Sequence, residues 1–334
     1  MPASNNFKLN NFGFGNGGTN TSTSTSYNLQ GIAGETNGSA GAGSTVNSKP
    51  GFIETEQANV PIITLSNPSN YYNKLKFVID QQNNPSDALY ALAISTDNFA
   101  TTNYIKSDNT IGSTLTLADY QTYATWGGAS GGLVIGLTPN TTYYVKAKAT
   151  QGKFTESGYG PVSSAATVAQ QLSFDIDVSP TDSDTSPPYA TNIGTITQNV
   201  ITTSTDRIWV DFQTNAEKGG KVYGSATNAG LHSATVSYTI AAVTGDLASL
   251  TEGYGIQSAS ATQSAGGPIA AVSPYNGSSG SVGLVNTILS IIYQTSNPIT
   301  AGRASFVIKA KSKALTPPAS DYTETMRLIA AGSF

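Results

Sequence analysis

The amino-acid sequence predicts an all-β protein with two successive β-sandwiches behind an extended N-terminal arm. Apolar residues recur at every second position in runs of strand length, as in LKFVID at 75–80 and LYALAIS at 89–95. Turn-forming residues separate these runs, as in QQNNPSD at 81–87. Helical periodicity is weak, and its best candidate, residues 281–294, is interpreted as either a short helix or a long buried strand.

Composition excludes several classes of function. Charged residues make up 11% of the chain, against about a quarter in ordinary soluble domains. The net charge of −4 provides no basic surface for a phosphate backbone, so nucleic acid is not an expected partner. The absence of cysteine excludes disulfides, thiolate-bound metals and thiol nucleophiles. No run of 18 consecutive apolar residues occurs, so we expect no membrane span in this chain.

The first 59 residues form the predicted arm. Residues 1–26 are interpreted as a short N-terminal strand with a flexible linker, and residues 27–59 as a Gly/Ser-rich arm with short strands. Such a composition buries too little apolar surface to fold alone. Its apolar residues are therefore expected to dock on a sheet edge, either of the same chain or of another copy. The predicted subunit-interface residues are Phe7, Leu9, Phe12 and Phe14.

Those four residues do not share a single strand face. Phe7 and Leu9 lie at odd positions, whereas Phe12 and Phe14 lie at even positions. A straight strand would direct the two pairs to opposite faces. Either a bulge or turn at Asn10–Asn11 resets the register, or the strand is buried on both sides, as a donated strand can be.

Residues 60–168 form the first predicted sandwich. GLTPNTTYYVKAKA at 136–149 places Tyr143 on an apolar strand face, and Pro139 lies at the strand entrance, where it costs no ladder hydrogen bond. This stretch resembles the tyrosine-corner strand of fibronectin type III domains, and GYGPVSSAAT at 158–167 resembles the closing strand. The resemblance implies a buried tyrosine ring whose hydroxyl group bonds to the backbone, and it implies no particular function.

Residues 169–334 form the second predicted sandwich. Apolar residues alternate in LSFDIDV at 172–178, in residues 207–212 and in residues 304–310. The last run, YTETMRLIAAGSF at 322–334, is predicted to be a strand inside a sheet. The predicted fold class is therefore tandem immunoglobulin-like or fibronectin III-like β-sandwiches.

Most of the chain between residues 26 and 334 resembles surface-exposed proteins of candidate-phyla bacteria of the Patescibacteria type. Matching stretches include SYNLQGIAGE, LSFDIDVSPTDSDTSPPY, EGYGIQSASATQSAGGP and ASDYTETMRLIAAGSF. The resemblance implies an extracellular, cell-surface location in a bacterium and implies no chemistry.

The sequence does not predict an enzyme. His232 is the only histidine, and its neighbours NAGLHSATVS indicate a turn with no nearby base or nucleophile motif. A hydrolase would need a carboxylate pair flanking a cleft, and no pair stands out from the others. We therefore predict no catalytic residue and no bound cofactor.

Calcium is the one metal that the sequence suggests. FDIDVSPTDSDTSP contains four carboxylates around a bend, and Ca²⁺ takes six to eight oxygen ligands in loose geometry. The alternative interpretation is a solvated strand face followed by an acidic loop, because the EF-hand spacing is missing. The candidate ligands are Asp175, Asp177, Asp182 and Asp184.

Trp126 is the candidate glycan contact. It lies in YATWGGASGG, which we predict to be an exposed loop, and exposed aromatic rings stack on sugar faces. Trp209 alternates with Ile208, Val210 and Phe212, so we expect it on the outer face of its strand, over a sheet or at a subunit contact.

Two functions follow from these features. The first is an extracellular structural protein, a subunit of a pilus-like surface filament or surface layer, whose N-terminal strand is donated to the next copy in a head-to-tail homopolymer. The alternative is a monomeric cell-surface adhesin or carbohydrate-binding protein, in which the sandwiches are spacers and the partner is a glycan or the surface of a host or neighbouring cell.

Overall fold

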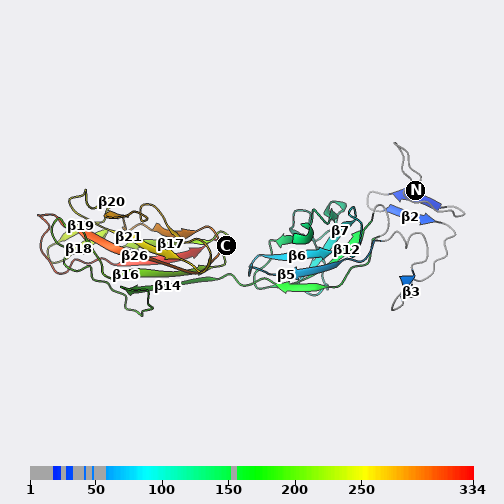
Figure 1. Ribbon diagram of the computed structural model, residues 1–334, viewed down its shortest axis with the longest axis horizontal. Coiled ribbons are helices and arrows are strands. Elements are labelled where there is room, and N and C mark those ends of the chain that lie inside the picture. Colours follow the sequence, from blue (N-terminus) through cyan, green and yellow to red (C-terminus); the bar gives the residue numbers. More distant parts are fainter. Residues whose placement is uncertain (1–17, 24–27, 33–40, 43–46, 49–57, 152–155) are drawn as a thin grey trace. The chain divides into compact units, whose positions relative to one another are not determined.

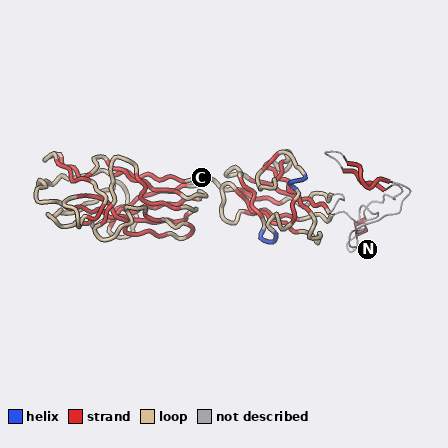
Figure 2. The backbone as a smooth tube through the Cα atoms, turned by 90° about the horizontal axis from the view of Figure 1, so that it is seen from above, coloured by secondary structure: helices blue, strands red, loops and turns tan. Residues whose placement is uncertain are grey.

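The computed structural model describes residues 18–23, 28–32, 41–42, 47–48, 58–151 and 156–334 (Figure 1). The described residues form strands and two single-turn 3₁₀ helices, with no α-helix among them (Figure 2). The prediction of an all-β chain is confirmed. The chain separates into two compact units, Met1–Val168 and Ala169–Phe334.

Two short hairpins precede the main part of the first unit. One pairs β1 (Gly18–Thr23) with β2 (Asn28–Ile32), and the other pairs β3 (Gly41–Ala42) with β4 (Asn47–Ser48). The predicted interface residues Phe7, Leu9, Phe12 and Phe14 lie outside the described residues.

The main part of the first unit contains two antiparallel sheets. One has the order β13-β12-β7-β8-β9, with β10 paired to β7, and the other has the order β11-β6-β5. The two 3₁₀ turns are Leu117–Asp119 and Gly128–Ser130. The strands are β5 (Ile62–Ser66), β6 (Lys74–Asp80), β7 (Leu89–Ser95), β8 (Asn103–Ile105), β9 (Ile111–Gly112), β10 (Gln121–Thr122), β11 (Gly132–Ile135), β12 (Thr142–Thr150) and β13 (Ser163–Ala166).

Residues from both sheets form one apolar core. Strand β6 contributes alternate residues, including Leu75 and Phe77, because successive side chains of a strand point to opposite faces. Leu92 of β7 and Val145 of β12 meet them from the other sheet. The alternate apolar residues from which strands were predicted at 75–80 and 89–95 therefore also lie in this core.

Tyr143 lies at the start of β12 with its ring buried in this core. Its hydroxyl oxygen accepts a hydrogen bond from the backbone N–H of Thr138 at 2.9 Å, which ties the strand to the preceding turn. This is the contact that the resemblance implied for the tyrosine in this stretch.

Replacing Tyr143 with phenylalanine is expected to lower the free energy of unfolding by about 1 kcal/mol, because the Thr138 N–H loses its acceptor while the ring stays packed. Chemical denaturation of the full chain measures the effect. Tyr144→Phe, on the opposite face of β12, is the matched control and should have little effect. Equal changes in both variants would show that the hydrogen bond of Tyr143 does not matter.

The second unit contains two larger antiparallel sheets, one small hairpin, β18-β19, and one two-stranded sheet, β20-β24. One large sheet has the order β14-β16-β26-β15, with β21 and β22 paired to β26, and the other has the order β23-β25-β17-β27. Both large sheets contribute to one apolar core, through residues such as Val210, Phe306, Val222 and Ile292.

The strands of the second unit are β14 (Leu172–Ser179), β15 (Thr202–Thr203), β16 (Arg207–Thr214), β17 (Gly220–Ala226), β18 (Gly230–Ser233), β19 (Tyr238–Ala241), β20 (Gly245–Asp246), β21 (Gly253–Thr262), β22 (Ala265–Gly266), β23 (Ala270–Ala271), β24 (Ser281–Val282), β25 (Ser290–Thr295), β26 (Ile299–Lys311) and β27 (Met326–Gly332).

Two sequence-based expectations for this unit were wrong. Residues 281–294 form neither a helix nor one long strand, because β24 ends at Val282 and β25 begins at Ser290. Gly283 bonds to Ile256 and has the ring of Tyr275 against it, so the chain leaves the strand there. Among the described residues, the C-terminal strand β27 pairs with β17 alone and is the last strand of its sheet, not an inner one. Alternation of apolar residues indicates a buried face but not the number of neighbouring strands.

Candidate functional site

The acidic stretch predicted to bind calcium forms an ion-pair cluster around an arginine. Asp177 of β14 is buried, with 1% of its side chain exposed, and the turn after it brings Asp182 and Asp184 nearby. Strand β16 adds Asp211, and β26 adds Arg303, which lies directly opposite Asp211 in the strand register. Sequence reasoning missed these last two residues, because neither is close to the acidic stretch in the chain.

The guanidinium group of Arg303 contacts three carboxylates. Its Nη1 lies 2.7 Å from Asp177 Oδ2 and also contacts Asp211, and its Nε lies 2.7 Å from Asp182 Oδ1. The same guanidinium group lies 5.2 Å from the ring centroid of Trp209, whose indole is buried on the outer face of β16. Trp209 therefore covers a sheet face, held there by a cation–π contact.

The pKa values of Asp177 and Asp211 shift in opposite directions. Burial alone would raise the pKa of Asp177, but hydrogen bonds from Thr185 and Arg303 outweigh burial and lower it. Asp211 is partly buried and lies near Asp177, and these effects raise its pKa despite the contact with Arg303. Of these two carboxylates, the fold therefore stabilises the charge of Asp177 better.

Three carboxylates of the cluster lie close enough to share a metal ion. Ligand atoms of Asp177, Asp184 and Asp211 all lie within 4.8 Å of one another. The other two predicted ligands, Asp175 and Asp182, do not belong to this group of three. Asp175 is exposed and accepts a hydrogen bond from the Ile176 backbone N–H. The guanidinium group of Arg303 already contacts Asp177 and Asp211, so a metal ion would have to compete with it for these carboxylates.

We expect added Ca²⁺ to leave the thermal unfolding of the wild-type chain unchanged, because Arg303 supplies the positive charge that these carboxylates need. Replacing Arg303 with methionine should make the same chain gain stability on Ca²⁺ addition, since the carboxylates then lose their cation. Thermal shifts with and without Ca²⁺ measure both. A Ca²⁺-dependent shift in the wild type that disappears in Asp177→Asn would contradict this expectation and support a calcium site.

Trp126 does not lie on an exposed loop, so the predicted exposure on which its assignment as a glycan contact rested was wrong. Only 3% of its surface is exposed, and its Nε1 donates a hydrogen bond to the Tyr90 carbonyl oxygen at 2.9 Å. Its ring also packs edge-on against Phe77. The glycines after it make this possible, because Gly127 has a φ of 93° and turns the loop back over the core.

Other aromatic rings of the first unit lie on the outer face of β12, where they alternate with lysines. Lys146 Nζ lies 3.9 Å from the ring centroid of Phe99 and 4.8 Å from that of Tyr159. Lys148 lies between Tyr159 and Tyr120, at 5.4 and 5.5 Å from their centroids. Burial together with neighbouring groups raises the pKa of Tyr159 to about 12. Each of these rings therefore has an ammonium group near its face, and Tyr159 keeps 37% of its surface exposed.

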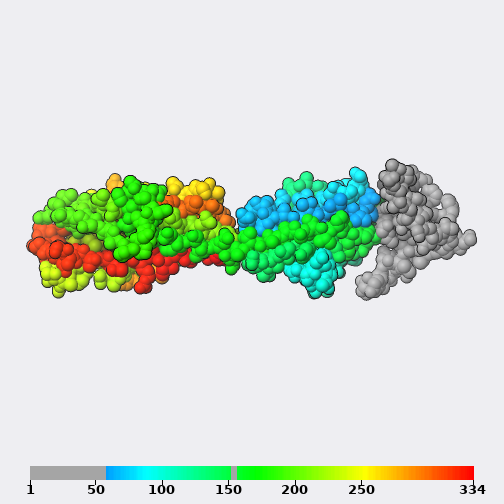
Figure 3. Space-filling view, turned by 90° about the horizontal axis from the view of Figure 1, so that it is seen from below, coloured from blue at the N-terminus to red at the C-terminus, as the bar shows by residue number. Residues whose placement is uncertain are grey.

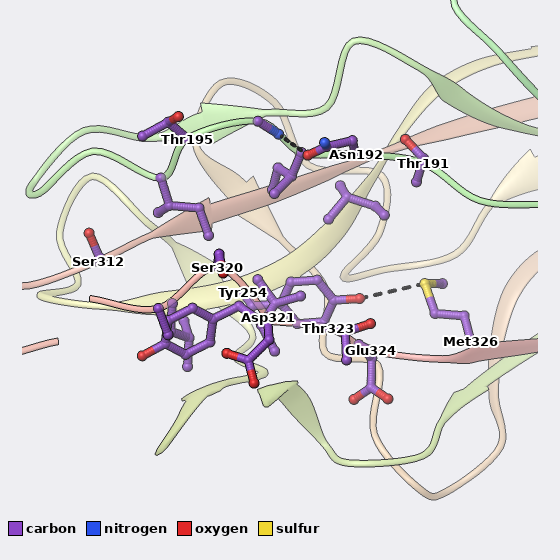
Figure 4. A pocket seen from close by; sticks show the side chains of 18 of the residues that line it. Thr191, Asn192, Thr195, Tyr254, Ser312, Ser320, Asp321, Thr323, Glu324 and Met326 are labelled. Atoms are coloured by element: carbon purple, nitrogen blue, oxygen red, sulfur yellow. Dashed lines mark hydrogen bonds between the residues drawn. The ribbon is translucent and has the colours of Figure 1, made fainter. Parts of the chain in front are cut away.

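A surface depression with a volume of about 1230 Å³ lies in the second unit. We call it the groove. Its floor includes Tyr254, whose hydroxyl contacts the sulfur of Met326, and Figure 4 shows this contact. Its walls are β14, β27, residues 189–196, which we call the strap, and residues 312–325, which we call the fixed wall. Alternation in β14 and β27 was visible in the sequence, but the groove between them was not.

Carboxylates anchor the fixed wall. Glu324 accepts hydrogen bonds from the backbone N–H groups of residues 227, 228 and 230 at 2.9–3.1 Å. Asp321 accepts bonds from Ser233 and Thr235, and these bonds lower its pKa to about 2. Backbone bonds between Thr323 and His232 add to them, so His232 is part of a structural contact.

The strap is held differently. Ile193 and Ile196 pack on apolar residues below them, and Figure 4 shows Thr191, Asn192 and Thr195 across the groove from Asp321, Thr323 and Glu324. Among the described residues, no backbone–backbone hydrogen bond joins residues 189–196 to another strand. The strap therefore covers apolar surface without completing a sheet.

Comparisons with known proteins identify no family for this chain. No family model matches it, and no curated protein matches it. Among solved structures it is similar to α-L-rhamnosidase from Dictyoglumus thermophilum, with 12% sequence identity and a TM-score of 0.22. That match covers 83% of this chain, which spans about 30% of the length of the rhamnosidase chain. No helix among the described residues has the length and apolar character needed to cross a membrane.

Proposed function

We propose that this protein is an extracellular structural subunit of a bacterial surface filament or surface layer, and that its N-terminal segment is donated to another copy. The observation that carries the proposal is the pair of terminal strands in the second unit. Strands β14 and β27 end different sheets, and both place half-buried apolar residues over the same core. A sheet edge of this kind accepts an added strand through main-chain hydrogen bonds.

The fold supports a structural role. In each unit two antiparallel sheets share one apolar core, and we interpret this arrangement as tandem β-sandwiches of the immunoglobulin or fibronectin III type. The hydrogen bond between Tyr143 and the Thr138 backbone supports the fibronectin III-like interpretation of the first unit. Sandwiches in tandem are typical spacers of cell-surface proteins.

The N-terminal sequence supplies a donor. Phe7, Leu9, Phe12 and Phe14 lie within ten residues of one another, and the Gly, Ser, Thr and Asn around them offer no core of their own. In a donated strand, side chains at alternate positions fill pockets of the acceptor. Because such a contact is head-to-tail, its repetition builds an open fibre. The alternative, a monomeric adhesin or glycan-binding protein, loses its candidate contact with the burial of Trp126.

Electron microscopy and sedimentation of the purified full chain test the proposal. We expect fibres or large assemblies whose formation depends on protein concentration. The matched variant replaces Phe7, Leu9, Phe12 and Phe14 with serine, which keeps the length of the segment and removes its apolar side chains. That variant should remain monomeric with an unchanged far-UV circular dichroism spectrum. A wild-type chain that stays monomeric at high concentration would refute the proposal.

A further inference from the structure

We infer that the groove of the second unit is the acceptor, and that its occupant is the segment around residues 5–14 of a second copy of this chain. The inference rests on the proposed function and assigns it a site. Four features of the described structure support it: the apolar floor of the groove, the open strand edges beside it, the weakly attached strap, and the contrast with the first unit.

The floor of the groove is continuous with the interior of the unit. Val178 and Leu328, from the two terminal strands, pack on the large core, and the buried Phe306 of that core also lines the groove. Further along, Leu231 and Tyr254 belong to a second, smaller apolar cluster. The groove thus has two apolar sections, and covering both removes more apolar area from water than covering either alone.

Each of the two strands beside the groove has one edge without a strand partner among the described residues. Strand β14 pairs with β16, and strand β27 pairs with β17. Neither β14 nor β27 has a second strand partner among the described residues. On the outer side of β14, the N–H groups of Ile176 and Val178 are bonded to side chains, those of Asp175 and Thr185. Side-chain acceptors of this kind can exchange for carbonyl groups of an incoming strand without leaving a donor unsatisfied.

The strap is the element that an incoming strand would displace. It holds its place through side chains such as Ile193 and Ile196, without backbone pairing to a strand, whereas the fixed wall opposite is anchored by Glu324 and Asp321. Displacing the strap therefore breaks few hydrogen bonds. An added strand would supply the main-chain bonds that the strap lacks.

The N-terminal segment matches the groove in pattern and in charge. Its apolar residues form two pairs, Phe7 with Leu9 and Phe12 with Phe14, separated by two asparagines, and the groove has two apolar sections. Lys8 is the only charged side chain among residues 1–17, whereas the fixed wall carries the carboxylates of Asp321 and Glu324. The segment lies outside the described residues, at the start of the chain.

The first unit is the weaker acceptor. Its core is closed by fully buried residues, and the half-buried apolar residues packed on it are Ile111, Tyr123 and Ala165. In the second unit the corresponding residues include Phe174 and Val178 on β14 and Met326, Leu328 and Ala330 on β27. In the space-filling view, the red C-terminal segment lies exposed beside green residues from the first part of the same unit (Figure 3).

Disulfide trapping in the full chain tests the acceptor, because the chain contains no cysteine of its own. One preparation carries Leu9→Cys and a second carries Leu328→Cys, and the two are mixed under oxidising conditions. We expect cross-linked dimers of the two different chains. The control, Ile329→Cys, lies on the same strand but is exposed on its other face, and it should cross-link at least tenfold less. Ile176→Cys on β14 repeats the test if Leu328→Cys does not fold.

The outcomes separate this inference from the proposed function. Assemblies that form normally but show no preference for Leu328 or Ile176 over Ile329 would overturn the acceptor assignment and leave the filament proposal standing. In a chain carrying both Leu9→Cys and Leu328→Cys, a cross-link confined to monomers at every concentration would overturn the second copy as the occupant. A mixture with neither assemblies nor cross-links would overturn both proposals.

Discussion

Replacing Trp126 with alanine is expected to lower the free energy of unfolding of the first unit by about 3–5 kcal/mol, the usual cost of removing a buried large aromatic side chain. The indole fills space beside Phe77, and its N–H satisfies the carbonyl oxygen of Tyr90, so the substitution leaves both a cavity and an unpaired acceptor. Calorimetry of the full chain measures the effect, because the two compact units should unfold in separate transitions. Only the transition of the first unit should move.

Trp126→Phe is the informative second variant. Phenylalanine keeps much of the packing but removes the donor to Tyr90, so we expect a loss intermediate between wild type and Trp126→Ala. A wild-type unfolding temperature in Trp126→Ala, combined with the loss of binding to a glycan array, would show that this tryptophan is a surface contact after all.

Replacing Arg303 with methionine is expected to destabilise the second unit by about 3–5 kcal/mol, since it leaves the buried carboxylate of Asp177 without its cation. Arg207→Met is the matched control, because Arg207 also stacks on Trp209, at 5.7 Å, but forms no ion pair among the described residues. Equal losses in the two variants would assign the effect to stacking on Trp209. The double variant Arg303→Met with Asp177→Asn should recover part of the loss, because neither partner is then charged.

The effect of Arg303→Met should depend on pH. The pKa of Asp177 is lowered in the folded chain: burial opposes this shift, but the bonds from Thr185 and Arg303 outweigh it. A carboxylate with a lowered folded pKa adds stability that is present above the pKa of the unfolded chain and is lost as the pH falls through the folded value. The difference between wild type and Arg303→Met should therefore be largest near neutral pH and should shrink below about pH 4. A difference that stays constant from pH 7 to pH 3 would contradict this account.

Local patterns of apolar residues predicted individual strands well, because the geometry of a strand depends only on residues close together in the chain. Alternating apolar residues placed strands at 75–80, 89–95 and 172–178, because the period of two follows from strand geometry alone. Predictions were wrong where they depended on which residues pack around a side chain, because the local pattern does not show this. Trp126 in a glycine-rich stretch was predicted to be exposed, but Gly127 allows a turn that buries the indole.

The candidate site was likewise predictable from the sequence only in part. The acidic stretch containing Asp177 was visible in the sequence, but its partner Arg303 lies 126 residues further along the chain, and only strand pairing brings the two together. A carboxylate cluster therefore suggested a metal, whereas the structure places a guanidinium group among the same oxygen atoms.

By itself the sequence determined the all-β class, several of the longer strands, and the four apolar residues of the N-terminal segment. Only the tertiary structure decided that β14 and β27 are the last strands of two sheets, and that a groove lies between them. The physical reason is that alternation selects the buried face of a strand, whereas the number of its hydrogen-bonded neighbours depends on pairing with residues far away in the chain.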